Sequence, residues 1–313
     1  MTRTALVADP ACQRHDPGHG HPESSGRFAA ALGALEASGL AAKMLRLAPR
    51  VLGRDDLLLA HTQEYLALAE GEITSGEMQL STGDTRVGPH SWEAALAAAG
   101  SALAAVDAVI GGTAENAFCV VRPPGHHASA EVGMGFCVLN NVALAARHAQ
   151  RRHGLERVLI VDWDVHHGIG TQDIFYADGT VLFFSTHQSP WYPGTGRADE
   201  TGTGAGRGMT INCPLPAGSG RDEIFAAFET RLRPAVEAFR PELVLISAGF
   251  DSRLGDPLGQ FRLSDADFAE LTLLLRGFAD RHASGRIVSI LEGGYELNGL
   301  ASAVVAHAGA LLG

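Results

Sequence analysis

Cysteine is scarce in this sequence, and the cysteines that it has are far apart. The four residues, Cys12, Cys119, Cys137 and Cys213, include no C-x-x-C pair. This spacing gives no evidence of a disulfide framework or of a structural zinc site, and it is typical of reduced thiols in a cytoplasmic protein. The first 20 residues also lack a basic segment followed by an apolar run, so we expect no secretory signal.

Long apolar runs and positive charge are the other deficits. A transmembrane helix needs about 20 consecutive apolar residues. The most apolar stretch, residues 94–110, is shorter and is interrupted by Asp107, so we expect a buried helix and no membrane contact. The 24 Lys and Arg residues against 35 Asp and Glu residues give a net charge of −11. An acidic surface repels phosphate groups, which argues against nucleic acid as a partner and weakly favours a cationic substrate or product.

Short apolar runs alternate with longer amphipathic segments along all 313 residues, and 46% of the residues are hydrophobic, enough for a sizeable core. Several apolar runs are continuous in Val, Ile, Leu and Phe, as expected for parallel strands covered on both faces. The pattern predicts one α/β domain over residues 1–313. We expect strands at residues 5–8, 117–121, 157–161, 181–185, 209–214, 243–247 and 287–291. We expect helices at residues 25–38, 55–69, 91–110, 141–153, 221–238, 265–282 and 298–312.

Chemically active residues follow five of the predicted strands. In open α/β sheets the ligand site lies beyond the carboxyl ends of the strands, so these residues are the first candidates for a site. The segments, in chain order, are Arg122-Pro-Pro-Gly-His126-His127, Asp162-Trp-Asp164-Val-His166-His167-Gly168, Thr186-His187, Ala248-Gly-Phe-Asp251 and Glu292-Gly-Gly-Tyr295.

The second of these segments has the composition of a metal site. On an extended chain, Asp162, Asp164 and His166 point the same way because they are two residues apart. Asp251 arrives from another strand end as a further ligand. An Asp/His/Asp set leaves positions open for water and substrate, which is typical of catalytic metal sites. The alternative is a solvated loop, and the other four strand ends weaken that interpretation. The set is compatible with zinc and with Fe(II), so the sequence leaves the metal open.

Two further segments suggest acid–base chemistry. His126 and His127 follow a turn fixed by two prolines and a glycine. One imidazole could take a proton from water while the other protonates a leaving amine; the alternative is a pair of surface or metal-binding histidines. Tyr295 follows two glycines, and its phenol could donate a hydrogen bond to a developing oxyanion. The alternative for Tyr295 is a place in the core.

These motifs, together with Gly133-Met-Gly-Phe-Cys-Val-Leu-Asn-Asn141, resemble the histone deacetylase family. That family includes bacterial histone-deacetylase-like amidohydrolases and acetylpolyamine amidohydrolases, and Asp-Trp-Asp-Val-His-His resembles its class II branch. The resemblance extends from about His15 to Tyr295. It implies the arginase/deacetylase fold, a three-layer α/β/α sandwich with a mainly parallel sheet of about eight strands.

The resemblance also implies roles for individual residues. The implied zinc ligands are Asp164, His166 and Asp251. His127 is the implied general base and the acid for the departing amine. His126 assists electrostatically and is oriented by Asp162, and Tyr295 stabilises the oxyanion.

Other implied positions surround this centre. The acyl channel is implied to run between Gly135 and Phe136 on one side and Tyr192 on the other. Asp84 is placed at the rim as an acceptor for a substrate N–H, and the loop His15–Arg27 borders the entrance. A potassium ion is implied close to the zinc, with ligands from Asp162, Asp164, His166, Ser185 and Thr186.

Two departures from the family pattern stand out. After His-His-Gly the family usually has Asp or Asn, which pairs with the second histidine of the dyad, whereas this sequence has Ile169. We therefore expect a lower pKa for His127 and reduced or pH-shifted activity. Polyamine-specific relatives carry an acidic residue in Gly-Asp-Pro-x-Gly, whereas this sequence has Leu258. An apolar rim favours acyl-lysine or another neutral amide.

The sequence therefore predicts a zinc-dependent deacetylase that hydrolyses the amide of acetyl-lysine, in a peptide or protein, or of a small acylated amine. An acetylpolyamine amidohydrolase with the same mechanism is the main alternative. A binuclear-manganese ureohydrolase and a non-catalytic acyl-binding relative are less favoured, because the histidine pair and Tyr295 are present. The oligomeric state stays open, a homo-oligomer included.

Overall fold

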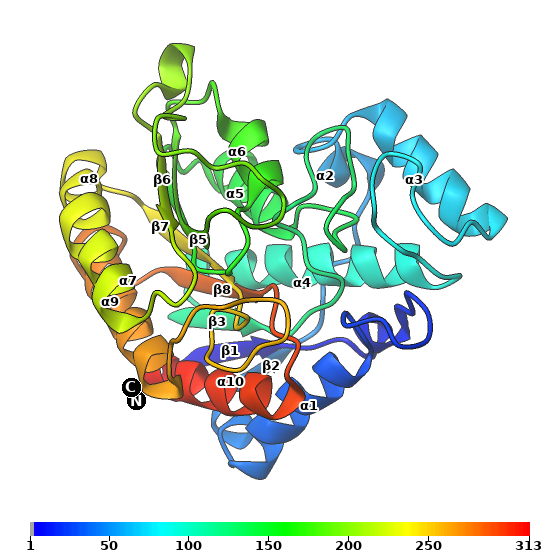
Figure 1. The fold of residues 1–313 in the computed structure, drawn as a ribbon, viewed down its shortest axis with the longest axis horizontal. Coiled ribbons are helices and arrows are strands. Elements are labelled where there is room, and N and C mark those ends of the chain that lie inside the picture. Colours follow the sequence, from blue (N-terminus) through cyan, green and yellow to red (C-terminus); the bar gives the residue numbers. More distant parts are fainter. Residues whose placement is uncertain (1–2) are drawn as a thin grey trace.

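The computed structural model describes residues 3–313. Within this part of the chain one sheet of eight strands is formed, in the order β2-β1-β3-β8-β7-β4-β5-β6, and every neighbouring pair is parallel (Figure 1). The strands are β1 (Thr4–Val7), β2 (Leu45–Leu47), β3 (Asn116–Cys119), β4 (Val158–Asp162), β5 (Val181–Gln188), β6 (Thr210–Leu215), β7 (Leu243–Ala248) and β8 (Ile287–Leu291).

Helices cover both faces of this sheet. On one face α1, α10 and α9 pack side by side; on the other, α4 and α5 pack together and α5 contacts α6 (Figure 1). The fold is therefore a three-layer α/β/α sandwich, as the sequence predicts. The helices are α1 (Gly26–Ala37), α2 (Arg54–Leu57), α3 (Gln63–Ser75), α4 (Ser91–Ile110), α5 (Asn141–His153), α6 (Ile169–Phe175), α7 (Arg221–Ala227), α8 (Arg233–Phe239), α9 (Asp265–His282) and α10 (Leu297–Leu312).

The seven predicted strands are present, with ends shifted by up to three residues. Every residue of β3, β4, β7 and β8 is buried, which explains why these strands are continuous apolar runs in the sequence. The eighth strand, β2, was missed. It has three residues, lies at an edge of the sheet and is mostly exposed, so it has no apolar pattern to detect.

Three helix predictions need correction. The helix expected at residues 55–69 is two helices, because Thr62 begins a new one by accepting a hydrogen bond from the backbone N–H of Tyr65 (3.2 Å). The helix expected at 221–238 is interrupted by a wide turn of π-helical hydrogen bonding at Phe228–Leu232. That turn directly precedes Pro234, which has no N–H to continue a regular helical ladder. The seven-residue α6 was missed, because it follows the Asp162–Gly168 motif without a recognisable cap.

Helix α4 has the predicted bounds, but its length does not exclude a membrane span. It runs for 20 residues and is long and apolar enough to cross a membrane by length and composition, so the expectation that this stretch is too short was wrong. Within its most apolar window 67% of the residues are buried inside the protein. This is the environment of a core helix, and one such helix is weak evidence for a membrane span.

The sheet order explains why the five motif-bearing strands matter together. They are β3, β8, β7, β4 and β5, and these occupy five adjacent central positions. Because all strands are parallel, their carboxyl ends meet at the same edge. The five motifs, which extend from Arg122 to Tyr295 along the sequence, are thereby brought to one place.

We expect the stability of the fold to depend on the fully buried centre of this sheet. Replacing Leu245, in the middle of β7, by alanine should lower the free energy of unfolding by about 2–5 kcal/mol, because the deletion leaves a cavity. The matched control is Leu273→Ala, at a leucine of α9 that is 51% exposed, which should change stability by less than about 0.5 kcal/mol. Urea-induced unfolding followed by circular dichroism measures both values. Equal losses in the two variants would contradict this account.

Candidate active site

The ends of β4 and β7 bring Asp164, His166 and Asp251 together. His166 Nδ1 lies 3.0 Å from Asp164 Oδ1 and 3.2 Å from Asp251 Oδ2. Both carboxylates are fully buried, and one donor atom from each of the three residues lies within 4.8 Å of the others. The chain bends after Asp162, the last residue of β4. Asp162 therefore turns away from this group and is not a member of it.

One carboxylate oxygen of this cluster lacks a hydrogen-bond donor among the described residues, which fits a bound cation. Asp164 Oδ2 accepts the N–H of Gly293 (2.9 Å), and Asp251 Oδ1 accepts the N–H of Val165 (2.9 Å). Asp251 Oδ2, in contrast, is buried and accepts no well-aligned hydrogen bond, although it faces His166. A buried carboxylate oxygen without a donor is costly. Two carboxylates and an imidazole with one free oxygen form a suitable ligand set for Zn²⁺.

Glycines create the space around these ligands. A Cβ atom on Gly293 would lie 2.0 Å from Asp251 Oδ2 and 2.5 Å from Asp164 Oδ2, and one on Gly249 would lie 2.2 Å from Asp164 Oδ2. No side chain larger than hydrogen can therefore stand at these two positions without displacing the carboxylates. The glycines of the motifs Ala248-Gly-Phe-Asp251 and Glu292-Gly-Gly-Tyr295 are explained by this close approach.

The electric field at the cluster favours positive charge. Burial alone would lower the pKa of His166, but its contacts with Asp164 and Asp251 raise that pKa to about 10. Burial and the neighbouring Asp164 carboxylate raise the pKa of Asp251 to about 7. Crowded carboxylates of this kind are stabilised by a proton or a metal ion between them.

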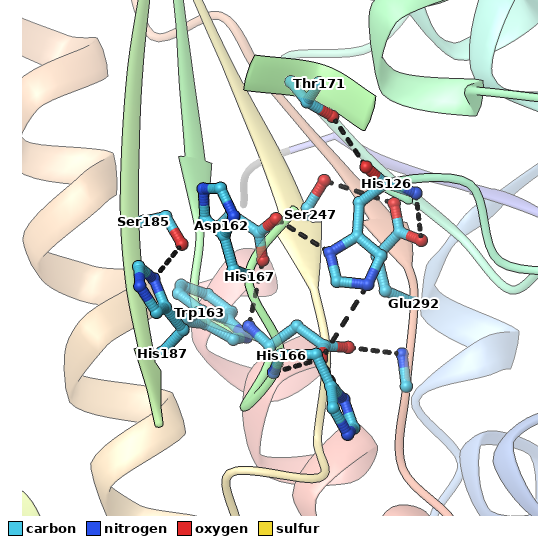
Figure 2. Close-up of polar contacts among 12 residues, drawn as sticks. His126, Asp162, Trp163, His166, His167, Thr171, Ser185, His187, Ser247 and Glu292 are labelled. Atoms are coloured by element: carbon cyan, nitrogen blue, oxygen red, sulfur yellow. Dashed lines mark hydrogen bonds and ion pairs between the residues drawn. The ribbon is translucent and has the colours of Figure 1, made fainter. Parts of the chain in front are cut away.

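His126 lies between two buried carboxylates (Figure 2). Its Nδ1 is 2.9 Å from Asp162 Oδ2, and its backbone N–H donates to Glu292 Oε2 (3.1 Å). Glu292 also accepts the N–H of Gly125 (2.6 Å) and the hydroxyl of Ser247 (3.2 Å). Although burial opposes it, the charge of Asp162 raises the pKa of His126 well above its usual range. His126 is thus suited to carry a positive charge.

His127 has the opposite environment, although its ring centroid is only 4.0 Å from that of His126. Its Nδ1 is buried and has no hydrogen-bond partner among the described residues. Burial and the adjacent charge of His126 lower the pKa of His127 well below its ordinary value. The two histidines therefore differ in charge at neutral pH, as in acid–base pairs whose environments separate their pKa values.

Tyr295 is held from both sides. The guanidinium of Arg27 lies 4.9 Å from its ring centroid. Asp256 accepts the backbone N–H of Tyr295 (2.6 Å) through one carboxylate oxygen and that of Leu258 (2.9 Å) through the other. Burial raises the pKa of Tyr295 well above its usual range, so the phenol stays protonated and can donate a hydrogen bond.

A cavity of about 230 Å³ leads from the surface to these groups. The predicted channel residues, two catalytic candidates and one metal-ligand candidate line it. The lining residues are Asp84, His127, Gly135, Phe136, His166, Trp191, Tyr192, Leu258 and Tyr295. The ring of Tyr192 lies edge-on to His127, and that of Phe136 edge-on to Tyr295. The predicted entrance loop contributes His21, whose ring is 4.6 Å from that of Phe136.

Asp84 fixes the two walls relative to one another. Its Oδ1 accepts the N–H of Gly135 (2.7 Å) and the hydroxyl of Tyr192 (3.2 Å). Gly135 has a φ of 56°, and a Cβ there would lie 2.2 Å from the His127 ring. A glycine is therefore required at this wall, since both the backbone conformation and the close contact exclude a side chain.

The predicted potassium ligands lie behind the zinc candidates. Asp162 and Ser185 are register neighbours on β4 and β5. The Ser185 hydroxyl contacts His187 Nδ1 (2.9 Å; Figure 2), and the hydroxyl of Thr186 is buried without a hydrogen-bond partner. The backbones of Asp164 and His166 pass nearby after β4. These residues are gathered at one place, but no observation identifies an ion.

Sequence reasoning did not assign roles to four residues at this site. Glu292 and Asp256 stand inside recognised motifs, and both accept hydrogen bonds from the backbone of catalytic candidates. Arg27 reaches Tyr295 from α1, and the indole N–H of Trp191 donates to the carbonyl of Leu258 at the rim (2.8 Å). The motif positions of Glu292 and Asp256 were the only available signal, because backbone acceptors and cross-chain contacts leave no spacing pattern.

Comparisons with known proteins agree with this geometry. The sequence pattern of the family described as "Histone deacetylase domain" matches residues 21–311. A "Probable deacetylase" of Archaeoglobus fulgidus is 40% identical over 95% of this chain and 82% of its own length. The "Histone deacetylase-like amidohydrolase" of Pseudomonas aeruginosa is 42% identical over 88% of this chain and 73% of its own.

Two further relatives extend the comparison. The human "Polyamine deacetylase HDAC10" is 42% identical over the whole of this chain, which spans 47% of that protein. The crystal structure of the HDA15 HD domain superposes with a TM-score of 0.93 and 36% identity, over 99% of this chain and 88% of the other.

The space beside the metal candidates can be tested with one substitution. Gly293→Ala should weaken the most tightly bound Zn²⁺ by at least about tenfold, because its Cβ would overlap the oxygens of Asp164 and Asp251. Competition with a chromophoric chelator measures the affinity. Gly33→Ala, in α1 where a Cβ meets no atom within 4 Å, is the control and should bind like the wild type. Unchanged affinity in Gly293→Ala would place the cation elsewhere.

Proposed function

This chain belongs to the histone deacetylase family, and we propose that it hydrolyses the amide bond of acetyl-lysine, in a peptide or protein, or of a similar acylated amine. The observation that carries this proposal is the grouping of three metal-ligand candidates, one charged and one neutral histidine, and a protonated tyrosine around a single cavity, which His127, His166 and Tyr295 line. An acetyl group is small enough for a cavity of about 230 Å³, and His127, His166 and Tyr295 are among the residues that line it.

We propose Asp164, His166 and Asp251 as the ligands of one zinc ion. When bound, Zn²⁺ would supply Lewis acidity for the acyl carbonyl and a lower pKa for water in the site. A potassium ion between the ends of β4 and β5, near Asp162, Ser185 and Thr186, is a further proposal. It would offset part of the buried negative charge.

His127 is the proposed base. It is neutral, and because its Nδ1 is enclosed, Nε2 is the nitrogen that can exchange a proton with the cavity. His127 takes a proton from the attacking water and later returns it to the departing amine. His126, charged through its contact with Asp162, stabilises negative charge that develops beside it.

Tyr295 is the proposed oxyanion donor. Its hydroxyl has no partner among the described residues and its ring lines the cavity, so it is free to donate to the carbonyl oxygen as that oxygen becomes negative. Asp256 holds the backbone of Tyr295 and that of Leu258, which connects the oxyanion donor to the cavity rim.

The rim supports acyl-lysine as the first choice of substrate. Asp84 is the only carboxylate among the residues that line the cavity, and one of its oxygens is already used by Gly135 and Tyr192. Leu258 and Trp191 make the rest of the rim apolar. Acetylpolyamines are the second candidate, because several relatives are named polyamine deacetylases. A cytoplasmic location stays a prediction.

The experiment that tests the function is a turnover panel on zinc-loaded protein. The substrates are an acetyl-lysine peptide, a trifluoroacetyl-lysine peptide, acetylputrescine and acetylspermidine. We expect turnover of the peptides, and a fall in kcat of about 10²–10³ in Tyr295→Phe because an oxyanion donor is lost. Tyr176→Phe, at a half-buried tyrosine outside the cavity, is the control and should keep full activity.

The other outcomes of this panel are equally informative. Turnover of the polyamines alone would keep the mechanism and overturn the interpretation of Leu258. No turnover of any substrate would favour a non-catalytic, acyl-binding relative. Release of urea from a guanidino substrate, with two ions bound at the ends of β4 and β7, would favour a ureohydrolase.

The absence of a partner for His127 predicts a particular pH dependence. His127 must be neutral to act as a base, and its lowered pKa keeps it neutral in mild acid, so the acid limb of kcat/KM should lie below pH 6.5. Ile169 begins α6 and is half-buried, and the next residue, Gly170, lies against the backbone of His127. In Ile169→Asn, an amide oxygen that accepts from Nδ1 would stabilise the charged imidazole and raise the pKa.

The acid limb should therefore move to higher pH in Ile169→Asn. A hydrogen bond worth about 1 kcal/mol corresponds to about 0.7 pH unit. Ile174→Asn, at a half-buried isoleucine of the same helix, should leave the limb in place. An unchanged pH–rate profile in Ile169→Asn would show that this position does not set the pKa of His127.

A further inference from the structure

A second cluster of metal-binding side chains lies outside the candidate active site. Asp107 comes from α4, and His148 and His153 come from α5. The Nε2 atoms of both histidines lie 2.7 Å from the same carboxylate oxygen, Asp107 Oδ1. One donor atom from each residue lies within 4.8 Å of the others, as in the active-site cluster. Two imidazoles converging on one carboxylate form a ligand set typical of borderline divalent ions.

The cluster lies near the amino ends of the strands, whereas the cavity lies at their carboxyl ends. His153 is the last residue of α5, and Asp107 lies in the last turn of α4. Both helices end shortly before a strand begins, β4 at Val158 and β3 at Asn116. The active site lies beyond the other ends of those strands. An ion at this cluster would therefore be independent of the one proposed for catalysis.

The helix ends add a favourable field. The carboxyl ends of α4 and α5 both terminate at the cluster, and the partial negative charge of a helix carboxyl end favours a cation there.

The observed separations are close to those of a coordinated set. Ligand atoms about 2.0–2.1 Å from a tetrahedral zinc ion lie about 3.3 Å apart. In the active-site cluster the nitrogen–oxygen separations are 3.0 and 3.2 Å, and here they are 2.7 Å. The two nitrogen–oxygen separations must therefore widen by about 0.6 Å when an ion binds. The side chains of Asp107 and His153 are 34% and 21% exposed, so they have room to move.

Arg50 sets a limit on the affinity. Its guanidinium lies 3.3 Å from Asp107 Oδ2 and 3.8 Å from Asp56 Oδ1. Arg50 contacts Asp107 Oδ2, whereas both histidines contact Oδ1. Asp107 Oδ1 is therefore available to an ion. The positive charge of Arg50 weakens the attraction of a second cation. We therefore expect a lower affinity here than at the Asp164, His166 and Asp251 cluster.

We propose that Asp107, His148 and His153 form a second divalent-cation site, which takes Zn²⁺ or a related borderline ion such as Co²⁺ or Ni²⁺ and ties α4 to α5. A surface hollow of about 310 Å³ is lined by Asp107, and the side chains of Asp107 and His153 are partly exposed, so an ion has access from solvent. Three protein ligands leave the remaining coordination position to water. The site stabilises the fold and takes no part in the reaction.

The test counts zinc on the full-length chain without an affinity tag. Metal is removed with a chelator, the protein is dialysed against a small excess of Zn²⁺, and bound zinc per chain is measured by mass spectrometry. We expect two ions in the wild type and one in His153→Gln. The matched control is His282→Gln: His282 also ends a helix and faces a carboxylate, Glu237 at 3.2 Å, but is in neither described three-residue cluster. It should retain two ions.

Two further measurements separate a metal site from a hydrogen-bonded triad. The first measurement uses Asp251→Ala, which lacks a ligand of the active-site cluster. Zn²⁺ should raise the melting temperature of this variant, and it should not raise that of the double variant Asp251→Ala with His153→Gln. The affinity for the second ion should fall on the order of 100-fold in His153→Gln. Substituting a residue that only supports a metal ligand already lowers metal affinity about 10–100-fold, and His153 is itself a proposed ligand. Deacetylase kcat with one equivalent of Zn²⁺ should stay within twofold of the wild type.

The overturning results are definite. One zinc per chain in the wild type, or equal numbers in the wild type and His153→Gln, would show that the cluster is a hydrogen-bonded triad. Loss of one ion from His282→Gln would show that helix-terminal histidines beside a carboxylate bind zinc unspecifically. Circular dichroism of each variant checks that it is folded.

Discussion

The active site depends on four carboxylates buried at one edge of a parallel sheet. Asp162, Asp164, Asp251 and Glu292 are all inaccessible to solvent, and they come from the ends of three adjacent strands, β4, β7 and β8. Burying like charges together is costly unless each one finds donors or a cation. Burial raises the pKa of Glu292 and of Asp251 to about 7 in each case, which shows the size of the cost.

Much of the surrounding structure offsets this charge. Backbone N–H groups of residues 125, 126, 164, 165, 166 and 293 donate to the four side chains. His126 supplies a positive charge beside Asp162. Asp251 Oδ2 is the oxygen left without a donor, and it faces His166. The arrangement leaves its uncompensated negative charge where a catalytic cation would act.

The same charge separates the two histidines. His126 contacts a carboxylate and carries a positive charge. That charge disfavours a second positive charge on His127, whose ring centroid is 4.0 Å away with the ring planes tilted by 40°. One histidine is therefore charged and its neighbour neutral.

The sequence by itself determined the fold class, the five motif-bearing strand ends and the family. It could do so because buried parallel strands are continuous apolar runs and because the motifs are local. The edge strand β2, the break at Thr62 and the wide turn before Pro234 were missed, since each depends on contacts or hydrogen bonds that leave weak local patterns.

Only the tertiary structure decided how the side chains divide into groups. An alternating Asp-x-Asp-x-His pattern suggests three residues on one face, but the chain bends after Asp162 and sends it to His126 instead. Asp256 beneath Tyr295, Arg27 beside it, and Asp107 between two histidines of another helix likewise depend on residues far apart in the chain. Spacing along a sequence cannot reveal such contacts, because they are created when the sheet and its covering helices pack together.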